Sequence, residues 1–243
     1  MKYNCSAKTI QRKIDAVKIE PQNTFPNVAN VLMDTTYFGR VFGVMVFKDS
    51  LTGRILLKQY VRQETNKLYQ SGIEEIGRRG IKIKAIICDG RKGLFQLFGS
   101  DIHMQMCQFH QVAIVRRYLT KNPKMQASIE LWEHTLLLKQ TDKESFVGGL
   151  EAWHEKWKDF LNERKIDPLG KNRYVHKRLR SAYRSLKTNL PWLFTWYDHL
   201  ELEIPNTTNA IDGHFADLKN KLRNHNGLSM TRKKKFIDEF FKA

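Results

Sequence analysis

The chain has 243 residues, 41% of them apolar and 11% aromatic, which is enough to bury a core and excludes an intrinsically disordered protein. No apolar run approaches the roughly 20 residues of a membrane-spanning helix, and residues 1–15 lack the apolar segment of a signal peptide. The 42 Lys and Arg against 25 Asp and Glu give a net charge of +17, which indicates a polyanionic partner, usually nucleic acid, with a merely solubilising surface as the alternative.

The N-terminal segment, residues 1–20, has the pattern of a short amphipathic helix. Ser6 is the expected N-cap, and Ile10, Ile14 and Val17 recur at helical spacing. A linker rich in Pro and Asn, residues 21–27, follows and stops the helix. The three cysteines, Cys5, Cys88 and Cys107, do not form a disulfide framework, so we expect a reducing, cytoplasmic compartment.

A region with the texture of strands comes next. Short turns join three β-rich runs, which predicts an antiparallel meander. A helix that stops at Gly80, a strand of central character, a short helix and a further strand follow it. The expected strands are 28–34, 41–47, 54–61, 81–88 and 103–109, and the expected helices are 63–79 and 92–98.

Residues 111–200 lose the strand pattern and read as long charged helices. Their apolar faces carry five tryptophans, Trp132, Trp153, Trp157, Trp192 and Trp196. A last helix is expected over 209–222, followed by the basic run at 232–235. The predicted order is βββαβαβ, an all-helical block, and a final helix, which is an α/β fold.

Two acids, Asp34 and Asp89, stand at the ends of the first and fourth predicted strands. Ligands of α/β sheets collect at the carboxyl ends of strands. If these two strands are parallel neighbours, which the crossover through helix 63–79 allows, the carboxylates converge and call for a hard cation such as Mg²⁺. The alternative for either acid alone is a residue that forms a turn.

Asp212 is the candidate for a third acid, in the first turn of the last helix. Lys219 and Arg223, at i+7 and i+11, share its helical face, which suits a nucleic-acid backbone approaching a metal. The alternative is a capping role, with Asn209 as N-cap and Asp212 stabilised by the helix dipole. Spacing does not decide between the two.

Several segments together resemble a known family. They are VLMDTTYFGR around Asp34, IICDG around Asp89, CQFH from Cys107 to His110, and NTTNAIDGHF around Asp212, followed by LKNKLRNHNGLS. In this order they resemble the DDE transposases of the Mutator-like group and related bacterial insertion-sequence enzymes. The resemblance spans residues 27–230.

The resemblance implies an RNase H-like domain, βββαβαβ-α, interrupted by an all-α insertion before the last catalytic helix. The expected segments are a remnant of a helix-turn-helix with its linker (1–24), the first part of the core (25–110), the insertion (111–204), and the final helix with a basic tail (205–243). The family's three catalytic, metal-binding acids correspond to Asp34, Asp89 and Asp212.

The implied activity is cleavage of DNA strands at the ends of an insertion element and transfer of these strands into a target. It implies two Mg²⁺ or Mn²⁺ ions held by the three carboxylates. The implied partner is double-stranded DNA, bound by a homodimer or larger oligomer in the nucleoid. The expected DNA contacts are Arg40, Lys92, Lys219 and Arg223, with the run at 232–235 and Arg178, Arg180 and Arg184 as further candidates.

Two departures from the family pattern keep other functions open. The third acid is normally Glu, and Asp212 is one methylene shorter. The segment from Ser6 resembles the recognition helix of a helix-turn-helix, with nothing before it. One interpretation is therefore that the chain is a truncated relic or a trimmed form. The alternatives are therefore a DNA-binding protein without full activity and an RNase H-like nuclease without strand transfer.

The remaining features favour structural roles. Cys107 and His110 could be half of a zinc site, but no second pair accompanies them, and a buried cysteine with a nearby histidine fits better. Trp153, Trp157, Trp192 or Trp196 could stack on an unpaired base, although their helical spacing favours core packing.

Overall fold

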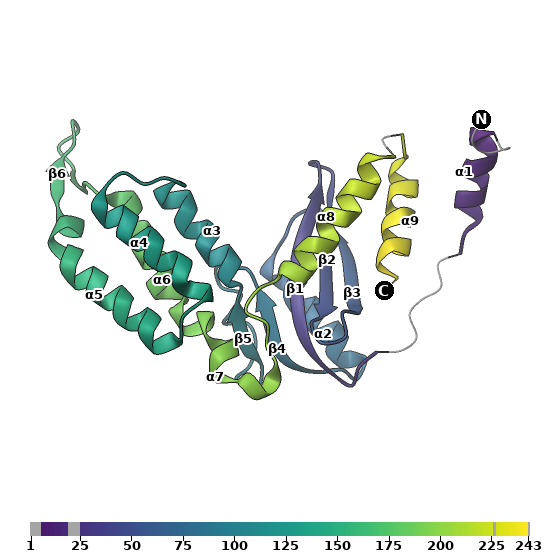
Figure 1. The fold of residues 1–243 in the computed structure, drawn as a ribbon. Coiled ribbons are helices and arrows are strands. Elements are labelled where there is room, and N and C mark those ends of the chain that lie inside the picture. Colours follow the sequence, from purple (N-terminus) through teal and green to yellow (C-terminus); the bar gives the residue numbers. More distant parts are fainter. Residues whose placement is uncertain (1–5, 19–24, 226, 243) are drawn as a thin grey trace. The chain divides into compact units, whose positions relative to one another are not determined.

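The computed structural model describes residues 6–18, 25–225 and 227–242 of the chain. It divides into two compact units, which Figure 1 shows in sequence colours. Unit one comprises residues 1–83 and 209–243, and unit two comprises residues 84–208. No helix in the described part of the chain is long and apolar enough to cross a membrane.

Three antiparallel strands form the centre of unit one, as the sequence predicts. They are β1 (Val28–Phe38), β2 (Phe42–Asp49) and β3 (Ile55–Val61). The turn between the first two closes at the Phe38–Phe42 pair, and Gly39 within it has a φ of +64°, a conformation that glycine adopts at little cost. All eight residues of β2 are buried, so helices must cover both faces of this strand.

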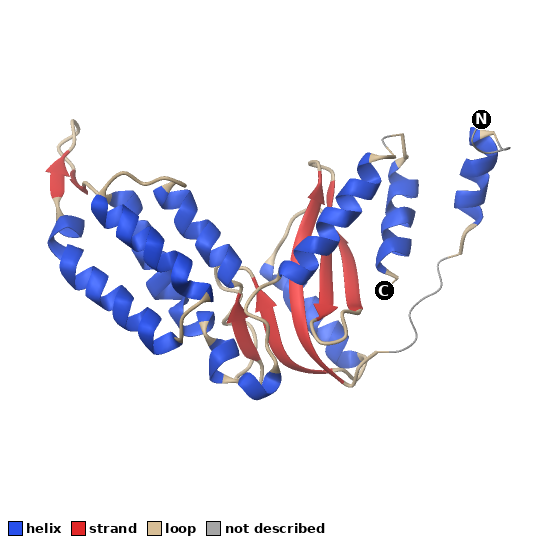
Figure 2. Ribbon diagram, in the orientation of Figure 1, coloured by secondary structure: helices blue, strands red, loops and turns tan. Residues whose placement is uncertain are grey.

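Helices do cover both faces of the meander (Figure 2). Helix α2 (Asn66–Arg78) packs on one face, where the Tyr69 ring lies 6.2 Å from that of Phe47. Helices α8 (Asn209–Arg223) and α9 (Met230–Phe241) cover the other face. Their buried side chains form one apolar cluster with the sheet, which contains Phe42, Val44, Val46, Ile55, Ile211, Phe215, Leu218, Leu222, Ile237 and Phe241.

The predicted N-terminal helix is present as α1 (Ala7–Ala16), and the Ser6 hydroxyl caps it by accepting a hydrogen bond from the Thr9 amide at 3.2 Å. Asp15 of α1 forms an ion pair with Arg232 of α9 at 2.8 Å. The flanks of the expected segment, residues 1–5 and 19–24 with most of the linker, lie outside the described residues.

The complete sheet has five strands in the order β3-β2-β1-β4-β5. Strands β4 (Lys82–Cys88) and β5 (His103–Met106) pair in parallel, whereas the first three strands are antiparallel. An antiparallel meander that continues into parallel strands, followed by helices, is the RNase H-like arrangement. The fold class expected from the sequence is therefore confirmed.

Unit two contains the predicted helical segment. Its helices are α3 (Gln108–Leu119), α4 (Gln126–Leu136), α5 (Lys143–Asn162), α6 (Lys177–Leu193) and α7 (Thr195–Asp198), with 3-10 turns at Leu137–Lys139 and Leu200–Leu202. A small hairpin of β6 (Arg164–Ile166) and β7 (Asn172–Tyr174) was not expected from the sequence. It is short and mostly exposed, so it lacks the apolar alternation that predicts strands.

Three local expectations were wrong. Residues 92–98 form consecutive turns and no helix, because Gly93 adopts a φ of +80° that interrupts a helical path. The expected strand 103–109 stops at Met106, and Gln108 already begins α3. The basic run at 232–235 is not a tail: it lies half-buried within α9, where Arg232 pairs with Asp15.

Candidate functional site

Asp34 lies inside strand β1 and does not end it, contrary to the expectation from sequence. The strand continues because Thr35, Thr36 and the two aromatic residues after them pair with β2 as far as Phe42. The Asp34 Oδ1 atom accepts a hydrogen bond of 2.7 Å from the Thr35 amide, and the residue is half-buried. The acid is thus held on a rigid strand and not in a turn.

The register of the meander determines which way Asp34 faces. Asp34 is paired with Val46, which belongs to the apolar cluster under α8. Directly paired residues of neighbouring strands project to the same face of a sheet, so Asp34 lies on the face that α8 covers. Thr35 projects to the opposite face, where its hydroxyl lies 3.0 Å from the Tyr69 hydroxyl of α2.

Asp212 lies in the first turn of α8, directly after Ile211, which is fully buried in the same cluster. Asp212 is half-buried, whereas Lys219 and Arg223 further along its face are exposed. Because α8 begins at Asn209, that residue is within the helix and Thr208 precedes it, so the expectation of Asn209 as N-cap was wrong. Unit one therefore places two of the three predicted acids in the layer where α8 covers the sheet.

The sequence pattern did not predict a buried lysine that lies in the layer between the sheet and α8. Lys48 of β2 is only 6% exposed, and its Nζ donates a hydrogen bond of 3.1 Å to the carbonyl of Ala210. The same Nζ lies 3.5 Å from His214 Nε2. This contact fixes the first turn of α8, two residues before Asp212, on the sheet. The available signal was a charged residue within the apolar run from Phe42 to Asp49.

Burial shifts the pKa values of both Lys48 and His214. Loss of hydration lowers the pKa of the Lys48 ammonium. Burial also lowers the pKa of His214, and the nearby Lys48 charge lowers it further. The neutral imidazole is therefore favoured beside the ammonium.

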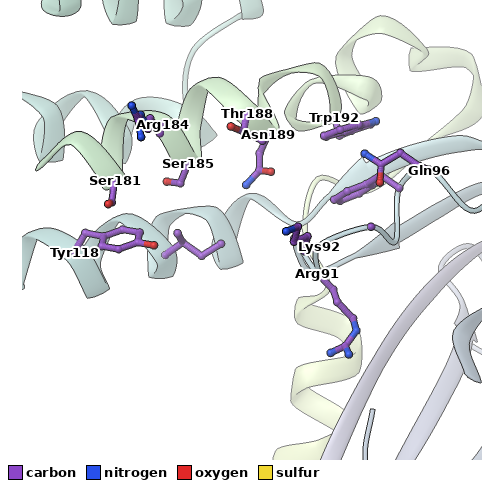
Figure 3. A pocket seen from close by; sticks show the side chains of 14 residues that line it. Arg91, Lys92, Gln96, Tyr118, Ser181, Arg184, Ser185, Thr188, Asn189 and Trp192 are labelled. Atoms are coloured by element: carbon purple, nitrogen blue, oxygen red, sulfur yellow. The ribbon is translucent and has the colours of Figure 1, made fainter. Parts of the chain in front are cut away.

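Asp89 follows the last residue of β4 in unit two, so the prediction that it stands at a strand end is confirmed. The next residue is Gly90, where a Cβ would lie 2.4 Å from Met106 Cε, so a larger residue would require the end of the Met106 side chain to move. Lys92 lines a cavity of about 410 Å³ that begins at Gly90 (Figure 3). Arg40 is exposed in the turn between β1 and β2 of unit one.

The Cys107 and His110 motif lies where β5 passes into α3. The buried Cys107 Sγ accepts hydrogen bonds of 3.3 Å from both the amide and the hydroxyl of Thr208. Burial raises the pKa of the Cys107 thiol, but hydrogen bonds from His110 and Thr208 outweigh burial and lower it. The Gln108 amide donates to the Asn206 carbonyl at 2.9 Å. The motif thereby fastens the segment that leads into α8.

The candidate phosphate contacts in unit two separate into two kinds. Arg178 and Arg180 donate hydrogen bonds to the backbone carbonyls of Arg117 and Leu161, so they stabilise the fold. Arg184 lines the same cavity as Lys92. Of the tryptophans, Trp153 is buried and donates to the Ala127 carbonyl at 3.0 Å, whereas Trp192 is stacked on Phe95 at the cavity wall.

The three predicted acids are divided between the units, with Asp34 and Asp212 in unit one and Asp89 in unit two. Within the described ranges, the structure shows no group of three or more His, Cys, Asp or Glu side chains placed together as metal ligands. The chemistry of the donor set nevertheless suits a hard divalent cation, since all three side chains are carboxylates.

Comparisons with known proteins give matches of structure. No family model and no curated protein matches the sequence. The Drosophila P element transposase strand transfer complex matches with a TM-score of 0.44 and 10% identity, over 98% of this chain and 85% of that one. The HTLV-2 integrase catalytic core domain in complex with magnesium matches with a TM-score of 0.26 and 16% identity, over 64% and 99%.

A third match is the simian T-cell lymphotropic virus intasome in complex with the PP2A regulatory subunit B56 gamma. Its TM-score is 0.27 and its identity 12%, over 76% of this chain and 59% of that one. At such identities and TM-scores, the RNase H-like assignment rests on the order and direction of the strands described above.

Proposed function

We propose that this chain is the catalytic domain of a DDE transposase, which cleaves DNA strands at the ends of an insertion element and transfers them into a target. The observation that carries the proposal is the layer shared by Asp34 and Asp212. The register puts Asp34 on the face under α8, and α8 carries Asp212 in the turn that Lys48 holds to the sheet.

Asp89 completes the proposed site. It follows β4, the strand next to β1 in the order of the sheet. In the proposal, Asp34, Asp89 and Asp212 together hold two Mg²⁺ or Mn²⁺ ions. When bound, these ions would activate a water molecule or a 3′-hydroxyl of the DNA as the nucleophile, and they would stabilise the oxygen that leaves the phosphorus.

The other residues of unit one have supporting roles. Lys48 positions the start of α8 through its hydrogen bond to the Ala210 carbonyl. Exposed Lys219 and Arg223 continue the face of Asp212 along the helix, where they would contact backbone phosphates. Three clustered carboxylates repel DNA, and the net charge of +17 offsets this repulsion over the surface.

The proposal is tested by replacing the acids with isosteric amides. The substrate is a supercoiled plasmid that carries the DNA flanking the gene on both sides, and nicked and joined products are followed with Mg²⁺ or Mn²⁺. Asp34→Asn and Asp89→Asn should each lower nicking by at least about 100-fold, because each removes one carboxylate ligand. DNA affinity, measured by fluorescence anisotropy, should be unchanged or slightly higher.

Asp217→Asn is the matched control, since Asp217 lies on α8, is exposed, and pairs with Lys221 at 2.8 Å. It should keep wild-type nicking. Wild-type nicking in the Asp34 or Asp89 variant would refute the assigned site. Nicking without any joined product would favour an RNase H-like nuclease over a transposase.

A further inference from the structure

The cavity beside Asp89 is built entirely within unit two. One wall is the turn segment 90–96, and the other walls are α3 and α6. The α6 residues that line it include Ser181, Ser185, Thr188 and Asn189, which recur at the spacing of one helical face. Figure 3 shows this polar stripe along α6, with Tyr118 of α3 across from it.

The charge of the lining is positive. Arg91, Lys92 and Arg184 contribute to it, and none of the described lining residues is acidic. In Figure 3 the Arg91 side chain points away from α6, whereas Lys92 lies near the end of the stripe at Asn189. Cationic side chains gathered at a concave surface without carboxylates attract an anion, and arginine pairs especially well with phosphate oxygens.

Hydrogen bonds fix the polar floor of the cavity. The fully buried Gln111 donates from Nε2 to Ser185 Oγ at 3.1 Å and accepts from Asn189 Nδ2 at 2.8 Å. Ser185 Oγ in turn donates to the Ala182 carbonyl at 2.7 Å. The floor is thus ordered before any ligand arrives, which reduces the entropic cost of binding.

Aromatic rings lie among these polar groups. The Trp192 ring stacks on Phe95 with centroids 4.6 Å apart and planes 8° from parallel, and Tyr118 is 37% exposed on α3. Flat apolar surfaces next to cations suit a nucleotide better than an isolated inorganic anion, because bases and sugars pack on rings while phosphates meet the charges.

We propose that this cavity binds the backbone of a DNA strand, with Lys92 and Arg184 contacting different phosphates and Tyr118 an adjoining sugar or base. The inference rests on the proposed function, because it assigns part of that DNA substrate to the cavity. Its location supports the strand as ligand. The cavity begins at Gly90, directly after Asp89, so a strand held there runs past this carboxylate. A free nucleotide carries the same phosphate chemistry and is separated by the test.

The test measures DNA binding by the full chain in EDTA, so that no cleavage contributes. Labelled duplex and single-stranded oligonucleotides are titrated at several salt concentrations. Arg184→Ala should weaken binding about 5- to 10-fold, and adding Lys92→Ala should weaken it by a similar factor again. Each substitution should reduce the slope of log K against log salt by about one.

Lys187→Ala is the matched control, because Lys187 is exposed on the same helix, carries the same charge, and does not line this cavity. It should change the affinity less than twofold. Melting curves of all variants should coincide with that of the wild type, since the substituted side chains are exposed.

Three results would overturn the inference. Equal affinities of the Arg184 and Lys187 variants would show that only general charge matters. The DNA affinities of wild type and Arg184→Ala are also compared in millimolar inorganic phosphate or mononucleotide at constant ionic strength. If the two affinities became equal, the cavity would be reassigned to a free phosphate compound. A wild-type chain that binds no DNA would refute this inference and the DNA substrate together, whereas DNA binding without nicking would leave the inference standing and refute only the activity.

Discussion

The Cys107 thiol accepts two hydrogen bonds from Thr208, one from its amide and one from its hydroxyl, each 3.3 Å long. Thr208 is fully buried and directly precedes Asn209, the first residue of α8. The thiol therefore holds the residue from which the helix of Asp212 begins. A cysteine in this position stabilises the entry to a helix through these hydrogen bonds.

We expect Cys107→Ala to lower the free energy of unfolding by about 1–3 kcal/mol more than a thiol deletion elsewhere in the core, because it removes the sulfur to which the buried amide and hydroxyl of Thr208 both donate. Cys88→Ala is the comparison, since Cys88 is also a buried cysteine that forms no disulfide. Thr208→Val, which removes only the hydroxyl, should cost about 1 kcal/mol. Urea denaturation gives these values, and equal losses for the two cysteine variants would contradict the role of Cys107.

Two glycines of α2 should respond in opposite directions to the same substitution. A Cβ at Gly72 would lie 2.1 Å from Phe47 Cζ, whereas nothing lies within 4 Å of one at Gly77. Gly72→Ala should therefore destabilise the protein by about 1–3 kcal/mol through overpacking. Gly77→Ala should stabilise it by up to about 1 kcal/mol, because alanine has the higher helix propensity. Urea midpoints test both, and a stable Gly72 variant would show that α2 can shift away from the sheet.

The fold was largely predictable from the sequence because its signals are local. Apolar runs joined by short turns predict the antiparallel meander of β1, β2 and β3. Helix α2 follows the meander, and Gly80, with a φ of +84°, stops this helix as expected. The prediction of a helix over residues 92–98 was wrong although their composition suits a helix. Gly93 has a positive φ within the turn segment that lines the cavity, and no local pattern predicts this conformation. The exposed hairpin of β6 and β7 has no apolar pattern to detect.

For the candidate site, sequence motifs suggest which acids to propose but not which residues hold them in place. The residues around Asp34, Asp89 and Asp212 carry the family resemblance, so the sequence predicts these acids as the ligands, and their role stays a prediction. Sequence could not show that Lys48 reaches Ala210, or that Cys107 reaches Thr208, since these pairs are separated by 162 and 101 positions. Such contacts arise from tertiary packing alone, and no local pattern records them.

The stability of the chain should decrease as the pH falls from about 7 towards 5. Burial lowers the pKa of His134 below its usual 6.5, and the hydrogen bond of 2.9 Å with the Phe146 carbonyl only partly opposes this shift. At pH values between the lowered pKa of the folded state and 6.5, the unfolded chain binds more protons than the folded one. The free energy of unfolding therefore increases with pH across this window and decreases as the pH falls.

A His134→Gln variant keeps a donor for Phe146 but does not titrate, so its stability should depend less on pH in this window. His103 and His214 also have pKa values lowered by burial, so some dependence should remain. Urea denaturation at several pH values measures the slopes. A variant whose slope equals that of the wild type would show that His134 does not contribute.

The length of the third acid separates a working enzyme from a relic. Lys48 fixes the first turn of α8 on the sheet, so the reach of Asp212 is set by its own side chain. We expect Asp212→Glu to lower nicking about tenfold or more, because a ligand displaced by about 1 Å disturbs the reacting geometry. Asp212→Asn, which loses the charge at constant size, should lower nicking further while DNA affinity stays the same. Nicking assays beside anisotropy measure both effects. A large gain of nicking with glutamate would instead show that the native chain is an impaired transposase that survives as a DNA-binding protein, since only a site built for the longer side chain would recover activity from it.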